Sequence, residues 1–212
     1  MLMAATLGAV LAGCAVAPPP NGSAPAPAPA AAAPAYVSGA PDTTDSVPGS
    51  ANALYVFRFK QTDPASSQFN YRDRYLSFYF RPSPTALYFR VENLQGRPVQ
   101  LDWEHSIFYD VNGRSGRIAH GPTRWKDRTA PLVYTLISGG QQFGDYMFPM
   151  DYLVDPGAAA DPNSQPHLPL VAEDASAPTF SGQTFGVDFA FVIEDRPRVY
   201  PFRFQIASVI PR

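Results

Sequence analysis

After residue 53, apolar and polar side chains alternate with a period of two over several short stretches. Successive side chains of a β-strand point to opposite faces of a sheet, so this pattern predicts strands that are buried on one face. The clearest stretches place the following apolar residues on one face: Tyr55, Phe57 and Phe59; Leu76, Phe78 and Phe80; Leu87, Phe89 and Val91; Phe185, Val187, Phe189, Phe191 and Ile193; Tyr200, Phe202, Phe204 and Ile206. No stretch keeps a helical period across three turns, so the pattern predicts an all-β domain.

Turn-forming residues separate these stretches. The last two stretches flank the polar segment 194–198, which predicts a hairpin between them. Asn112 and Gly113 predict a second hairpin, because both residue types tolerate a positive φ angle. Weaker signals predict further strands near residues 98–103, 106–111, 116–120, 132–137 and 143–148.

Eight or nine short antiparallel strands with these turns predict a β-sandwich that is Ig-like in the broad sense, with Greek-key connections. A lipocalin-like barrel is the alternative. Uneven strand spacing and a long Pro-rich segment near 154–183 favour the sandwich. Because so long a loop is unusual in a compact domain, we expect a functional insertion, a strap over one edge, or a disordered segment.

The first 50 residues differ in composition from the rest. They contain none of the 16 Lys and Arg residues and, of the 28 aromatic residues, only Tyr36. Residues 15–50 hold nine prolines and eleven alanines, a composition that favours extended polyproline II and cannot form a packed core. The sequence therefore predicts a disordered tether over 14–50 and a folded domain over 51–212.

A short apolar segment precedes the tether. Residues 2–12 are apolar or small and uncharged, too few for a membrane span of about 20 residues but typical of a signal peptide. The segment ends in Leu11-Ala12-Gly13-Cys14, with the only cysteine of the chain, and this ending resembles the lipobox of bacterial lipoproteins. The resemblance implies that residues 1–13 are removed and that Cys14 is acylated, which anchors the chain in a lipid bilayer.

The residue after the cysteine is Ala15. By the same resemblance, the absence of an aspartate there implies the outer membrane. We expect the anchored domain to face the periplasm. A second resemblance covers roughly residues 85–150. A strand that ends in Asn93, a turn at Gly96 and a strand with Trp103 and Ser106 are similar to a pattern in uncharacterised bacterial lipoproteins with Ig-like domains.

That second resemblance implies structural roles for these residues, and no assigned activity comes with it. The chemistry of these residues predicts that Asn93 and Gly96 shape a turn, that Trp103 fills the core, and that Ser106 satisfies a local backbone group.

Charge and cysteine content exclude several classes. Residues 51–212 carry all 16 basic residues and 16 of the 18 acidic ones, so the formal net charge of the domain is zero. Nucleic-acid binding depends on neutralising phosphates, so we expect no nucleic-acid partner. One cysteine excludes an intramolecular disulfide framework and a Cys-rich zinc site.

No catalytic motif is present. The sequence has no His-x-x-x-His pattern, no Gly-x-Ser-x-Gly elbow, no P-loop and no dinucleotide fingerprint. His105 and His120, with Asp102, Glu104 or Asp110, offer the one conceivable two-histidine metal site. We therefore expect no catalytic residue, no metal and no cofactor.

The domain has more tyrosines than one core requires. We expect eight aromatic residues to lie on its surface, as cross-strand pairs or as a protein- or glycan-binding face: Tyr75, Tyr79, Tyr88, Tyr109, Trp125, Tyr134, Tyr146 and Tyr152. Tyr, Trp and Arg are enriched at binding hot spots. The best single candidate is therefore the polar loop that holds Arg124, Trp125, Lys126 and Arg128.

These features together predict a non-enzymatic outer-membrane lipoprotein whose tethered β-sandwich binds other proteins of the bacterial cell envelope. A glycan- or small-ligand-binding module of the periplasm is the alternative, and a metal-dependent envelope enzyme is a further one.

Overall fold

The computed structural model describes residues 44–46, 55–161 and 163–211. The predicted signal peptide (1–13), Cys14 and most of the predicted tether lie outside these residues. The described residues form thirteen strands in two antiparallel sheets, together with three short 3-10 helices. No helix of this part of the chain is long and apolar enough to span a membrane.

The larger sheet has eight strands. Six of them follow the order β1-β2-β13-β12-β7-β10, while β3 pairs with β2 and β8 pairs with β7. Their bounds are β1 (Thr44–Ser46), β2 (Tyr55–Asp63), β3 (Ala65–Ser66), β7 (Val99–Tyr109), β8 (Ser115–Gly116), β10 (Thr135–Ile137), β12 (Thr184–Ile193) and β13 (Arg196–Pro211).

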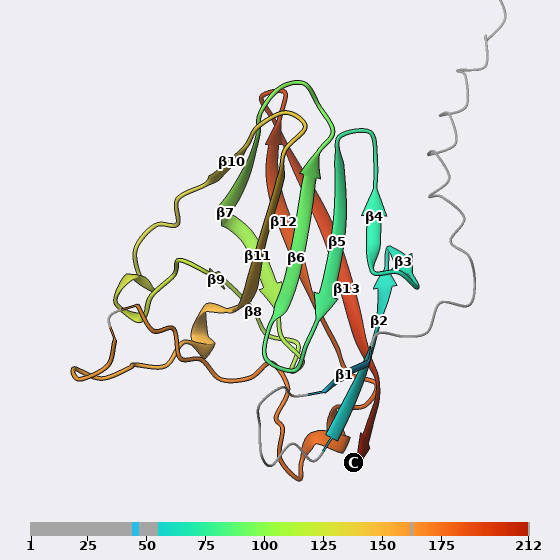
Figure 1. Ribbon diagram of the computed structural model, residues 1–212, viewed down its shortest axis with the longest axis vertical. Helices are drawn as coiled ribbons and strands as arrows, with labels where there is room; N and C mark the ends of the chain where they lie inside the picture. The colour runs from blue at the N-terminus through green and yellow to red at the C-terminus, as the bar shows by residue number, and fades with distance from the viewer. Residues whose placement is uncertain (1–43, 47–54, 162, 212) are drawn as a thin grey trace, which may run out of the picture. The chain divides into compact units, whose positions relative to one another are not determined.

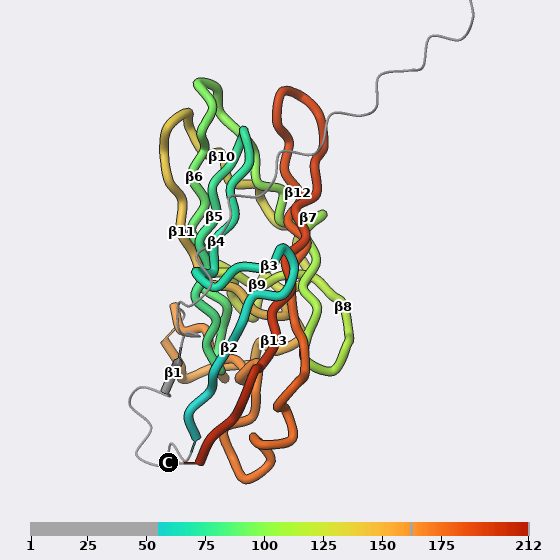
Figure 2. Tube along the Cα trace, turned by 90° about the vertical axis from the view of Figure 1, so that its right-hand side faces the viewer, coloured from blue at the N-terminus to red at the C-terminus, as the bar shows by residue number. Residues whose placement is uncertain are grey.

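The smaller sheet has five strands in the order β4-β5-β6-β11-β9. Their bounds are β4 (Asn70–Arg72), β5 (Leu76–Pro82), β6 (Leu87–Asn93), β9 (Ile118–His120) and β11 (Gln142–Pro149), and the 3-10 helices are η1 (Trp125–Asp127), η2 (Met150–Tyr152) and η3 (Ala177–Phe180). Figure 1 looks onto the faces of the two sheets, and Figure 2 shows them edge-on as separate layers.

The predicted all-β, two-sheet antiparallel architecture is confirmed. The lipocalin-like alternative is wrong, because the strands form two sheets that each have end strands instead of one closed sheet. The strand number exceeds the predicted eight or nine because six of the thirteen described strands have only two or three residues. Such strands are too short for alternation to be visible in a sequence.

The inner faces of the sheets meet in an aromatic core. All five strongly alternating stretches lie in strands, and every phenylalanine predicted for their inner faces is buried. The ring centroid of Phe78 on β5 lies 4.9 Å from that of Phe202 on β13 and 5.9 Å from that of Phe189 on β12. Each such pair adds about 0.5–1.5 kcal/mol to the free energy gained by burying the rings.

One long strand, β7, replaces the two strands predicted near 98–103 and 106–111. Asp102 pairs with Ala190 and Ile107 pairs with Asp188, so β7 carries three residues more than β12 between these pairs. The Ser106 hydroxyl donates a hydrogen bond to the Asp102 carbonyl (2.6 Å) and accepts one from the Ala190 amide (2.9 Å). The predicted role of Ser106, satisfying a local backbone group, is confirmed.

The predicted hairpins are present, with differences in their turns. The β12–β13 turn contains only Glu194 and Asp195, with φ angles of 52° and 60°, because Arg196 already pairs with Ile193. In the turn between β7 and β8 only Gly113 has a positive φ angle (77°), so Asn112 does not use its tolerance for that conformation.

The described sheet begins earlier than the sequence predicts. Residues 44–46, which the composition assigns to the tether, form β1, where Thr44 pairs with Arg58 of β2. Backbone pairing requires no apolar side chain, so hydrophobic alternation gives no sign of this strand.

The predicted long loop lies across the sandwich as a strap in its described part, residues 154–161 and 163–183. The Val171 amide donates a hydrogen bond to the Pro84 carbonyl (3.0 Å), and Leu170, Val171 and Ala177 are buried. The His167 ring stacks on Phe148 with 3.9 Å between ring centroids. Figure 1 shows this segment in orange, running from the left of the view to the lower end of the sheets.

Burial lowers the pKa of His167 from its usual value of 6.5, because the strap and Phe148 shield the imidazolium from water. A histidine whose pKa is lowered on folding binds fewer protons in the folded state than in the unfolded state. Its contribution to stability is therefore complete above pH 6.5 and is lost as the pH falls below that value.

We predict that His167→Phe, which keeps an aromatic ring against Phe148 but cannot be protonated, reduces the loss of stability below pH 6.5. Urea unfolding of both proteins over a pH series measures this difference. Parallel pH dependences of the two unfolding free energies would contradict the assignment.

Candidate functional site

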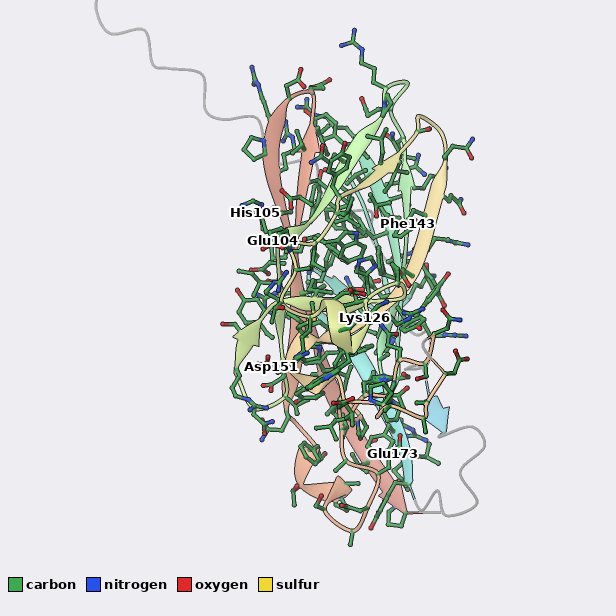
Figure 3. All side chains as sticks on the ribbon, turned by 90° about the vertical axis from the view of Figure 1, so that its left-hand side faces the viewer. Glu104, His105, Lys126, Phe143, Asp151 and Glu173 are labelled. Carbon is green, nitrogen blue, oxygen red and sulfur yellow. The ribbon has the colours of Figure 1, made fainter. Side chains whose placement is uncertain are left out.

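One end strand of each sheet lies on the same side of the sandwich. β9 ends the smaller sheet and β10 ends the larger one, both at the left in Figure 1. Residues 121–134 connect these two strands and are called the crossover below. In Figure 3 Lys126 of the crossover lies lower in the view than Glu104 of the larger sheet and Phe143 of the smaller one.

The crossover contains all four residues of the predicted binding loop: Arg124, Trp125, Lys126 and Arg128. Trp125 was expected on the surface, yet it is only partly exposed and packs against the core. The guanidinium carbon of Arg128 lies 3.8 Å from the centroid of the Trp125 ring. Trp125 is therefore not an open stacking platform.

The two arginines of this loop also bind its backbone. Arg124 donates hydrogen bonds to the carbonyls of Gly121 (2.6 Å) and Thr123 (3.1 Å), and Arg128 donates one to the carbonyl of Trp125 (2.8 Å). Lys126 is exposed, and its side chain makes no hydrogen bond or ion pair with another described residue. It is the member of the predicted loop whose charge is free to meet a ligand.

Arg117 and Glu104 hold the second half of the crossover in place. Arg117 donates hydrogen bonds to the carbonyls of Arg128 (2.8 Å) and Ala130 (2.6 Å) and pairs with the Glu104 carboxylate (2.9 Å). That carboxylate also accepts a hydrogen bond from the Leu132 amide (2.8 Å). These bonds, from Leu132 first and then Arg117, hold the pKa of Glu104 below its usual range.

His120, at the start of the crossover, is fixed by a carboxylate and a stacked ring. Its Nδ1 lies 3.0 Å from Asp145 Oδ2 on β11, and its ring is parallel to Trp103, with 4.0 Å between centroids. The Trp103 indole donates a hydrogen bond to the Thr135 hydroxyl on β10 (2.9 Å). Trp103 is fully buried, as predicted, and links the core to both end strands.

The conceivable two-histidine site does not form. His105 pairs with Asp102 (2.8 Å) and is exposed, whereas His120 pairs with Asp145. Among residues 44–46, 55–161 and 163–211, no group of three or more His, Cys, Asp or Glu side chains is placed to hold a metal ion. The arrangement thus gives the metal-dependent enzyme alternative no support.

An imidazole oriented by a carboxylate is also the geometry of a general base. In the described part of the chain, no hydroxyl or thiol makes a hydrogen bond to the His120 ring, whose one bond goes to Asp145. The His120–Asp145 pair joins β9 to β11 at the point where the crossover begins.

The end of the crossover exposes apolar side chains. Val133 is 78% exposed, Tyr134 is 54% exposed, and Leu136 on β10 is 59% exposed. They adjoin a shallow depression of about 340 Å³ that Leu132, Tyr134 and Thr135 help to line. Within the described residues, β10 has a strand partner, β7, on one side only.

We name Val133, Tyr134, Leu136 and the unpaired side of β10 the edge surface. Of its residues, sequence reasoning selected only Tyr134. The usable signal was the run Leu132-Val133-Tyr134 after Pro131, which does not alternate and so cannot bury every apolar side chain of a strand.

The eight aromatic residues expected on the surface divide into three groups. Tyr79, Tyr134 and Tyr146 are exposed; Tyr88, Tyr109 and Trp125 are partly exposed; Tyr75 and Tyr152 are buried. Tyr75 is buried because two arginines, Arg74 and Arg198, cover its ring, with guanidinium carbons 4.4 and 4.3 Å from the centroid. The expectation is wrong for these two buried residues.

No family model, curated protein or solved structure matches the chain. The function is therefore inferred from the geometry of the described residues and from the resemblances in the sequence.

We predict that Thr135→Val lowers the free energy of unfolding by about 1–3 kcal/mol, because it leaves the buried Trp103 indole N–H without an acceptor. Urea unfolding measures the change. Thr135→Ser is the matched control, since it keeps the hydroxyl and should lose less stability than Thr135→Val. Equal losses in the two variants would show that this hydrogen bond does not matter.

Proposed function

We propose that the protein is a non-enzymatic lipoprotein of the bacterial outer membrane whose tethered β-sandwich binds another envelope protein through the edge surface. The observation that carries the binding role is the exposure of Val133, Tyr134 and Leu136 beside an end strand that has a free side. The similarity of residues 11–14 to a lipobox supports anchoring, and Ala15 supports the outer membrane. We propose that the domain faces the periplasm.

The end strand favours an extended peptide segment as the partner's binding element. The free side of an edge strand offers unpaired N–H and C=O groups, and many domains bind peptides by adding a strand there. Folded proteins often protect such edges with charged side chains. β10 instead presents exposed Leu136, which favours apolar side chains in the partner.

The charges of the crossover refine this partner. Arg124, Lys126 and Arg128 outnumber the one acidic residue, Asp127, and Lys126 makes no ion pair with a described residue. An extended apolar segment with an acidic residue beside it fits this combination. Because Glu104 and Arg117 already hold the crossover in place, little conformational entropy is lost when a partner binds.

The domain is also proposed to be Ig-like in the broad sense. Its two antiparallel sheets, the repeated passage of the chain between them and the closing β12–β13 hairpin support this class. An experimental structure whose strand order departs from these two sheets would contradict it.

We predict that Leu136→Lys weakens capture of the partner by at least about tenfold, because it places a charge where an apolar contact forms. A photo-reactive amino acid at position 136 should crosslink to one envelope protein in intact cells. Val199, 64% exposed on β13, is the matched control position and should give no such product.

Thermal unfolding of Leu136→Lys should stay within about 2 °C of the wild type, because the side chain is exposed. Identical crosslinking from positions 136 and 199 would contradict the edge surface as the binding site. That result would not bear on the membrane anchor, which a separate experiment tests.

For the anchor, we predict that Cys14→Ser abolishes incorporation of labelled palmitate and moves the protein out of the outer-membrane fraction, because serine provides no thiol for acylation. Metabolic labelling and density-gradient fractionation measure both effects. Unchanged labelling in Cys14→Ser would contradict acylation at this residue.

A further inference from the structure

The outer face of the smaller sheet carries a second hollow, whose lining residues differ from those of the depression beside the edge surface. It is a groove of about 470 Å³, within the usual size of small-ligand sites. Arg81, Tyr88 and Tyr146 of strands β5, β6 and β11 form one side, and Gln165 and His167 of the strap are on the other.

Two tyrosines form the sheet side of this groove. Tyr88 and Tyr146 are directly opposite each other on neighbouring strands. A Cβ atom at Gly144 would lie 2.8 Å from the Tyr88 hydroxyl, so the glycine lets the end of this ring lie close against β11. The 41% exposed Tyr146 and the partly exposed Tyr88 together provide an aromatic surface beside the groove.

Hydrogen bonds hold the two sides of the groove in place. The Tyr146 hydroxyl donates to Gln165 Oε1 (2.9 Å), and the amide of the same Gln165 donates to the carbonyls of His120 (2.8 Å) and Thr123 (2.5 Å). His167 is stacked on Phe148. Both walls are therefore set before any ligand arrives, which limits the ordering entropy lost on binding.

Cations without acidic partners lie on the same face. The guanidinium carbon of Arg81 is 5.4 Å from the ring centroid of Tyr88, and that of Arg90 is 5.5 Å from the ring centroid of Tyr79. Both arginines lie in paired strands, but neither guanidinium group makes an ion pair or hydrogen bond to another described residue, so its N–H groups are free to donate. Guanidinium groups bind carboxylates and phosphates with paired hydrogen bonds.

We propose that this groove binds an anionic saccharide, with a sugar ring against Tyr146 and Tyr88 and a carboxylate or phosphate on Arg81. Sugar rings present C–H groups that pack on aromatic faces, and a sugar hydroxyl can donate a hydrogen bond to the remaining lone pair of Gln165 Oε1. A peptide is disfavoured, because β5, β6 and β11 each have strand partners on both sides and offer no backbone groups for pairing. This site extends the proposed function and does not depend on it.

Calorimetry on the full chain in detergent micelles, with three probes of equal ring number, tests the proposal. Trigalacturonic acid carries carboxylates, maltotriose phosphate carries a phosphate, and maltotriose is neutral. We expect at least one anionic probe to bind about tenfold more tightly than maltotriose. The tighter of the two identifies carboxylate or phosphate as the recognised group.

Two variants locate the site. Tyr146→Ala and Arg81→Gln should each weaken binding of the preferred probe by about tenfold, through lost stacking and lost charge respectively. Tyr134→Ala is the matched control: it removes another exposed tyrosine, from the edge surface, and should leave sugar binding unchanged.

Three results would overturn the proposal: equal binding of all three sugars, equal weakening by Tyr134→Ala and Tyr146→Ala, or a triglutamate peptide that binds as tightly as the anionic sugars. Circular dichroism of each variant keeps loss of folding separate from loss of binding. Partner crosslinking from position 136 is measured independently, so failure of one site does not decide the other.

Discussion

Interlocked phenylalanine rings between the two sheets determine where everything else in this domain can lie. Each sheet has one apolar face that is stable only when covered, and Phe78, Phe189 and Phe202 meet across the gap. Because the inner faces are buried against each other, they cannot contact a ligand or a partner. Binding can use only the outer faces, the end strands and the connections between the sheets. The edge surface and the groove of the smaller sheet are of these kinds.

On the side of the crossover the core runs outward through Trp103 to His120, a polar ring in an aromatic stack. The stack needs a flat group there, and the neighbouring carboxylate of Asp145 gives its ring nitrogen a partner. One residue can therefore complete the core and fix a surface connection at once. Ser106 also has two roles. It is buried in the sandwich, and its hydroxyl bonds to backbone groups of both β7 and β12 where three extra residues interrupt their pairing.

The sequence predicted the long strands because half-buried strands alternate strictly, as in Phe185 to Ile193. It divided β7 in two because the residues inserted before Ile107 shift the alternation to the other face. It did not reveal that Trp125 packs against the core, since nothing local shows that Arg128 covers its ring. The facing of Tyr88 and Tyr146 was also hidden, because strands β6 and β11 are distant in sequence and only the folded sheet brings them together. Such long-range pairings explain why the candidate sites were harder to predict than the fold.

The pairing of β2 with β13 has a mechanical consequence. Tyr55, where β2 begins, is opposite Pro211, and the antiparallel pairing extends, with two register shifts, to Asp63 opposite Arg203. A pull on Tyr55 along the strand, against a sandwich held elsewhere, would load this ladder in shear. Its hydrogen bonds would then resist together, whereas a sideways pull would open them one after another. The ladder between β2 and β13 is therefore suited to resist a force applied along its own strands.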